Sequence, residues 1–144
     1  MKKVLLFLNL LIGIGACGGG VMAFLSTHSM ETAESFGLSK EMLLNSPFQS
    51  FLIPGIFLLV VIGFGNLISG WLLYRKKDYF AEVMMGLILI AWILIQVYML
   101  MAIVFLHVLF FLLGVVQLTL SVYTIKKLQL KLPFSAPLID YLCN

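Results

Sequence analysis

The sequence predicts an all-α protein, a bundle of four transmembrane helices with both termini in the cytoplasm. Hydrophobic residues make up 62% of the 144 residues and charged residues 10%, whereas a soluble domain usually carries about 25% charged residues. Few polar side chains are left to cover a water-facing surface, so most of the surface must face lipid. Four apolar runs are each long enough to cross a bilayer, which takes about 20 residues. We expect one membrane domain over residues 1–131 and a short cytoplasmic tail over 132–144.

The first helix is expected over residues 4–25, directly after Lys2 and Lys3. A polar, net acidic stretch follows over about 26–46 and forms the long outer loop. Within this stretch, Ser39 can cap a short helix whose apolar residues rest on the membrane surface, so we expect the loop to be structured.

The second helix is expected over residues 47–74. Ser46, Pro47 and Gln49 form a start signal, because serine caps a helix, proline suits its first position and glutamine completes a capping box. Pro54 lies inside this run, where it removes one backbone hydrogen bond and should kink the helix near its outer end.

The remaining apolar run, residues 79–125, must fold back on itself. A single helix of that length would be about 70 Å long, more than twice the roughly 30 Å hydrocarbon core. His107 is the strongly polar side chain near the middle of the run, so we place a short outer turn at about 103–107. The third and fourth helices are then expected over 79–102 and 107–125.

The distribution of cations orients the bundle. Eight of the nine lysine and arginine residues flank helix ends that would share one side of the membrane. Cytoplasmic loops are enriched in such residues, so we assign these ends to the cytoplasm and the protein to the plasma membrane. This placement explains the net charge of +3 without a nucleic-acid partner, and the expected partners are the lipid bilayer, further copies of this chain or a larger membrane complex. The eight cations are Lys2, Lys3, Arg75, Lys76, Lys77, Lys126, Lys127 and Lys131.

Small and amide residues repeat at helical spacing in three of the predicted helices. Small residues let helix backbones approach, and amides hydrogen-bond between them. Asn9, Asn66 and Gln117 lie about 9–13 Å from the basic helix ends, so one intramembrane polar layer can contain all three. The layer either joins the helices or forms a polar pocket or pathway. The first, second and fourth helices should pack through these faces, with the third helix more peripheral or in contact with a partner. The repeats are Asn9-Gly13-Ala16-Gly20, Gly63-Asn66-Gly70 and Gly114-Gln117-Ser121.

The sequence offers no arrangement typical of an enzyme or of a proton-coupled transporter. Glu82 and Asp78 are expected at the cytoplasmic edge, paired with residues 75–77 or in contact with water, which leaves the predicted spans without a carboxylate. His28 and His107 are both expected on the outer side, but they lack the close spacing of metal ligands. No catalytic, cofactor-binding or metal-ligating residue is therefore assigned.

The segment Ile-Gly-Ala-Cys at residues 14–17 resembles a bacterial lipoprotein signal, in which Cys17 would be lipidated and become the mature N-terminus. The apolar run continues to Leu25 without a polar linker, which favours a retained span over a cleaved one. Cys17 and Cys143 would lie at different depths, so no disulfide is expected between them.

The run from Ser46-Pro47-Phe48 to Pro54-Gly55, after a glycine-rich first span, resembles a family of small uncharacterised bacterial membrane proteins with four helices. Ile95-Gln96 in the third predicted helix and Leu113-Gly114 in the fourth are similar to pairs in that family. The resemblance implies the four-helix topology and a bacterial plasma membrane, and it implies no activity.

For function, the sequence favours a non-enzymatic structural, accessory or regulatory subunit. The alternative is a protein that binds or carries a lipid or another small apolar molecule, in the groove that a kink at Pro54 would open. A membrane enzyme is a third class, but paired carboxylates or a nucleophile beside a base are not evident in the sequence.

The orientation can be tested in a chain whose two native cysteines are replaced by serine. Ser35→Cys should react with a membrane-impermeant thiol reagent added outside the cell, because residue 35 lies in the predicted outer loop. Lys77→Cys should react only when the reagent reaches the inner side. The reverse labelling pattern would contradict the orientation derived from the cations.

Overall fold

The computed structural model describes residues 1–26, 51–76, 78–100, 103 and 105–128. Regular structure in these ranges is entirely helical, and it forms four rods that are long and apolar enough to cross a membrane. The predicted class, all-helical with four apolar helices, is confirmed. The rods are α1 (Lys2–Ser26), a continuous second rod (Leu52–Lys76) made of α3 (Leu52–Phe57), a π-helical segment η2 (Leu58–Phe64) and α4 (Gly65–Lys76), then α5 (Tyr79–Leu100) and α6 (Phe105–Leu128).

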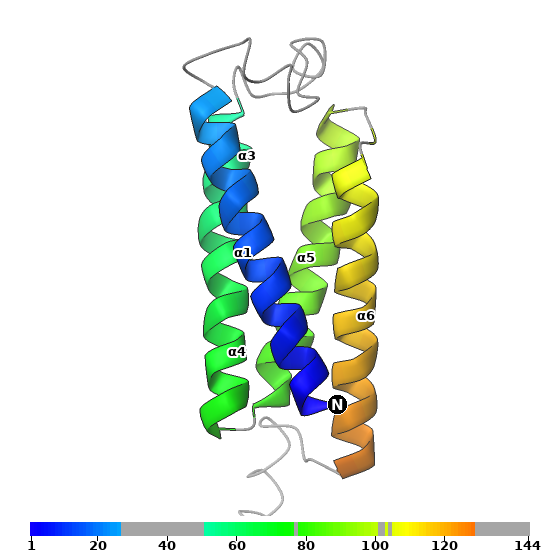
Figure 1. Ribbon diagram of the computed structural model, residues 1–144. Helices are drawn as coiled ribbons and strands as arrows, with labels where there is room; N and C mark the ends of the chain where they lie inside the picture. Colours follow the sequence, from blue (N-terminus) through cyan, green and yellow to red (C-terminus); the bar gives the residue numbers. More distant parts are fainter. Residues whose placement is uncertain (27–50, 77, 101–102, 104, 129–144) are drawn as a thin grey trace, which may run out of the picture.

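The rods lie side by side, with the start of α1 and the end of α6 at the same end of the bundle (Figure 1). We call this the basic end, because Lys2, Lys76 and Lys126 lie there, and we call the other the opposite end. α1 runs obliquely, approaching α6 toward the basic end and α3 toward the opposite end. The predicted outer loop beyond Ser26, the start signal at Ser46–Gln49 and the tail lie outside the described residues.

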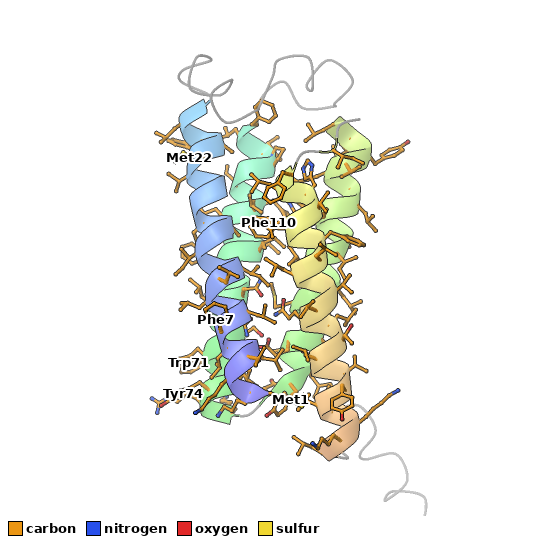
Figure 2. All side chains as sticks on the ribbon, turned by 45° about the vertical axis from the view of Figure 1, so that its right-hand side comes forward. Met1, Phe7, Met22, Trp71, Tyr74 and Phe110 are labelled. Atoms are coloured by element: carbon orange, nitrogen blue, oxygen red, sulfur yellow. The ribbon has the colours of Figure 1, made fainter. Side chains whose placement is uncertain are left out.

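Outward-facing side chains are large and apolar on all four rods (Figure 2). Phe7, Ile68, Leu94 and Leu112, one from each rod, are between 55% and 63% exposed. Trp71 and Tyr74 lie near the basic end (Figure 2). An apolar exterior suits contact with lipid chains, and aromatic residues near a helix end suit the membrane interface. These surfaces fit four membrane-spanning helices.

The turn between the third and fourth helices is shifted from its predicted place. We expected a turn at about 103–107, but His107 lies in the first turn of α6, which continues to Leu128. α5 ends at Leu100. The prediction was wrong because it used the polarity of His107 as a sign of contact with water, whereas this side chain is only 8% exposed and faces the interior.

Pro54 does not break a hydrogen bond as predicted. It is the third residue of α3, where a backbone N–H has no helical partner in any case, so proline costs nothing there. The irregularity follows it instead, as the seven-residue π-helical segment η2. π-helical turns are rare and frequently occur at functional sites.

Glycine sets the contact between α1 and the second rod. A Cβ added to Gly20 would lie 2.7 Å from Leu59 Cβ and 2.8 Å from the carbonyl oxygen of Gly55. A Cβ added to Gly63 would lie 2.7 Å from Cys17 Sγ. These distances leave no room for a side chain, so the two backbones pack closely through the predicted small-residue faces.

α5 is not peripheral, which corrects the prediction for the third helix. Gly86 of α5 packs against Leu118 of α6, whose backbone nitrogen would lie 3.1 Å from an added Cβ. Conversely, Gly114 of α6 packs against Leu89 of α5, whose side chain would lie 3.3 Å from a Cβ added to Gly114. Leu89 and Ile93 also belong to the buried core. The prediction failed because it ranked helices by their number of small residues, although one well-placed glycine suffices for a close contact.

Gly20→Ala should lower the free energy of unfolding relative to Gly18→Ala. The new methyl group at position 20 would meet the backbone of the second rod, and such overpacking typically costs about 1–3 kcal/mol. An added Cβ at Gly18 has no atom within 4 Å. Both variants gain the helix propensity of alanine, so the comparison cancels it. Reversible unfolding in mixed micelles measures the difference, and equal stabilities would contradict the close contact at Gly20.

Candidate functional site

The three predicted amides meet inside the bundle, each on a different rod. Gln117 Nε2 of α6 lies 3.1 Å from Asn9 Oδ1 of α1 and 3.1 Å from Asn66 Oδ1 of α4, and it donates to both. All three side chains are at most 1% exposed. The structure therefore brings Asn9, Asn66 and Gln117 together as one hydrogen-bonded group.

A fourth residue, Glu82 of α5, completes this polar cluster. Its Oε2 accepts from Asn9 Nδ2 at 2.7 Å and from Gln117 Nε2 at 3.1 Å, and its Oε1 accepts from Ser69 Oγ at 2.7 Å. Glu82 is fully buried. We expected Glu82 to pair with cations or water at the edge of the membrane, and that expectation is wrong. Among the described residues, its hydrogen-bond partners are all neutral side chains.

A sequence signal for Glu82 was present but was not recognised. Residues Glu82, Gly86, Leu89 and Ile93 follow one another at i, i+4, i+7 and i+11, the spacing that marked the inner face of the first helix. All four are buried. Distance along the chain from the nearest cations does not say which face of the helix carries the carboxylate, whereas this spacing does.

Local contacts with the backbone orient the polar cluster. Asn9 Nδ2 also donates to Leu5 O at 3.0 Å, and Asn66 Nδ2 donates to Ile62 O at 2.8 Å, each one turn back on its own rod. These bonds leave both amide oxygens directed at Gln117. Gly70 makes room for the approach, because a Cβ there would lie 3.1 Å from Asn9 Cβ.

The polar cluster has fewer donated protons than acceptors. The amide nitrogen of Gln117 carries two protons, but three oxygens lie 3.1 Å from it. The other atom of the same amide, Gln117 Oε1, is buried and accepts no hydrogen bond from the described residues. An unpaired buried acceptor costs free energy, so this group can accept a further proton donor.

A cavity of about 370 Å³ lies toward the opposite end, between α1, the second rod, α5 and α6. Gly18, Pro54, Leu100 and Phe110, one from each rod, line it, and Figure 2 places Phe110 in the half of the bundle away from Met1. The polar side chains in the lining are Gln96 and His107. The cavity is therefore apolar with two hydrogen-bonding groups.

The other residues considered from the sequence lie apart from the polar cluster. Cys17 lies within α1 and packs against Gly63 of η2. Its lipidation stays a prediction. His28 and Cys143 lie outside the described residues. Within the part of the chain that the structure describes, no three His, Cys, Asp or Glu side chains are grouped so as to hold a metal ion.

Gln117→Leu should lower the free energy of unfolding by about 1–3 kcal/mol, because it leaves buried acceptors on three other rods without their shared donor. Gln96→Leu is the matched control, since the side chain of Gln96 lines the cavity and lies outside the polar cluster. The two variants would be compared by reversible unfolding in mixed micelles. An equal loss in both variants would mean that the polar cluster contributes no more than an ordinary intramembrane amide.

Comparisons of the chain with protein-family models, with curated proteins and with solved structures gave no match. The polar cluster and the cavity are the two features of the described residues that bear on function.

Proposed function

We propose that this protein is a non-enzymatic, multi-pass protein of the plasma membrane that binds a lipid acyl chain or another small apolar molecule between its helices. The observation that supports this function is the cavity of about 370 Å³ toward the opposite end. Ligand pockets are typically about 300–1,000 Å³ in volume and mostly apolar, with a few polar groups that fix the orientation of the ligand. The cavity matches that description in both size and lining.

Glycine residues of α1 keep this space open. Gly15, Gly18 and Gly19 all line the cavity. A Cβ added to Gly18 would have no atom within 4 Å, so a larger side chain there would project into free space. At Gly15 the ring of Phe110 packs close to the α1 backbone, because it would lie 3.2 Å from an added Cβ. The lining from α1 therefore consists of three glycines together with Met22 and Ala23.

A polar side chain gives the cavity a preference among apolar ligands. Gln96 can hydrogen-bond a ligand, whereas the lining apart from Gln96 and His107 offers almost only carbon. A molecule with an apolar body and one polar group would satisfy both kinds of surface. A single acyl chain with its head group, or an isoprenoid alcohol, has this chemistry.

This observation favours binding over the purely structural or accessory role that the sequence favoured. A subunit that only joins other proteins needs no internal cavity, and dense packing would stabilise it better.

The positive-inside bias supports placing the basic end and both termini in the cytoplasm, so that the cavity lies toward the outer leaflet. Further copies of this chain or a larger membrane complex remain compatible with ligand binding.

Native mass spectrometry of the protein released from lipid nanodiscs tests this function. The wild-type protein should retain a bound lipid or other apolar molecule, and Gly18→Phe should lose most of it, because the new ring fills the cavity. Val21→Phe is the matched control, since Val21 lies on the same helix and is 46% exposed. A wild-type protein without a retained molecule, or equal retention in both variants, would contradict the proposal.

A further inference from the structure

The polar cluster has no part in the proposed binding function, and it contains the carboxylate that the sequence argument placed at the membrane edge. We propose that Glu82 is a proton-binding site inside the membrane, where one proton binds and leaves while the protein stays folded. Glu82 and its hydrogen-bond partners do not line the cavity.

The first support is the count of donors and acceptors. The polar cluster contains five side-chain oxygens of Asn9, Asn66, Glu82 and Gln117, and the protons directed at them come from one N–H of Asn9, the hydroxyl of Ser69 and the two N–H groups of Gln117. Gln117 Oε1 is left without a donor. Protonation of Glu82 forms one O–H bond and so adds a fifth proton to the four that are directed at these five oxygens.

The second support is charge. An ionised carboxylate buried away from water is costly unless a cation pairs with it, and such a group otherwise takes up a proton. The partners of Glu82 are two amides and a hydroxyl. The charged or titratable groups nearest along the surrounding rods are the N-terminal amine of Met1, Lys2 and Lys3 at the start of α1, Tyr74, Arg75 and Lys76 of α4, Asp78 and Tyr79 near Glu82 in the sequence, and Tyr123, Lys126 and Lys127 of α6.

Two of these groups have other partners in the structure. Lys2 Nζ donates to the carbonyl oxygen of Tyr74 at 3.1 Å. Asp78 Oδ1 accepts from the backbone N–H groups of Phe80 and Ala81, at 3.0 and 3.2 Å, and so caps the start of α5. Both groups therefore hydrogen-bond at the basic end of the bundle and not with the carboxylate of Glu82.

The packing favours a proton over a larger cation. Three oxygens from three rods converge at 3.1 Å on one point, but Gln117 Nε2 already occupies it. Every side chain in the polar cluster is at most 2% exposed. A proton adds no volume to such a site, whereas a sodium ion would need the amide of Gln117 to move away.

Two buried hydroxyl groups follow Gln117 toward the basic end, and each donates to a backbone carbonyl one turn back on α6, Ser121 Oγ to Gln117 O at 2.6 Å and Thr124 Oγ1 to Leu120 O at 2.7 Å. Ser121 and Thr124 follow Gln117 on α6 at i+4 and i+7, so the three side chains share one face. Ser121 is fully buried and Thr124 is 4% exposed. Glu82 itself lies only three residues, or about 4.5 Å along the axis, from the first residue of α5. Glu82 therefore lies within about one turn of the end of its helix, close to the basic end.

The test is carbon NMR of the full chain in nanodiscs, with 13C in the side-chain carboxyl of glutamate only. The four glutamates, residues 31, 34, 41 and 82, give four signals. Glu82→Asp keeps a carboxyl group in the cluster but removes one label, so the signal that disappears belongs to Glu82. Glu34→Gln is the control, because it removes a glutamate of the predicted outer loop.

We expect the Glu82 signal to shift reversibly with pH as a one-proton transition, and the side-chain amide signal of Gln117 to shift along the same curve. Replacing potassium by sodium at constant pH should change neither signal. A Glu82 signal that stays constant over the pH range in which the protein remains folded would overturn the proposal. A shift produced by sodium would also overturn it, and would indicate a metal-cation site instead.

Discussion

The shared hydrogen bonds of Gln117 are the interaction on which the arrangement of the bundle depends. This one amide joins α6 to Asn9 of α1, Asn66 of α4 and Glu82 of α5, so a single side chain ties together all four rods. In a bilayer, apolar surfaces gain little by leaving lipid for other apolar surfaces, so directional contacts and close packing decide which helices meet. The glycines allow the close packing, and the hydrogen bonds of the polar cluster are the directional contacts.

The polar cluster and the cavity lie in different halves of the bundle along its axis. Buried polar side chains lie toward the basic end, where Ser69 donates to Glu82 and where Ser121 and Thr124 of α6 are also buried. Toward the opposite end α1 leans away from α6 (Figure 1). The apolar cavity, which Phe110 lines, lies in that half of the bundle. The tilt of α1 accounts for both, because it brings Asn9 against Gln117 at one end and Gly18 away from α6 at the other.

The sequence was sufficient for the class of fold and for most of the polar cluster. Long apolar runs specify membrane-spanning helices through length alone, and the spacing of Asn9, Asn66 and Gln117 identified three residues that meet. Glu82 was misplaced because distance along the chain from a cation does not say which way a side chain points. His107 was misplaced for a related reason, since a polar side chain can face the interior as well as water. The π-helical segment has no comparable sequence signal.

That π-helical segment fixes the rotational register of the second rod. The wide turns of a π-helix advance by less than the about 100° per residue of an α-helix, so winding the same residues of Leu58–Phe64 as regular α-helix would rotate α3 by roughly one residue step relative to α4. Pro54 and Gly55 would then turn away from α1, while Asn66 kept its place beside Gln117. The wide turns of η2 thus allow one rod to present a cavity wall at one end and a hydrogen-bonding face at the other, although these two faces would not align on a regular helix.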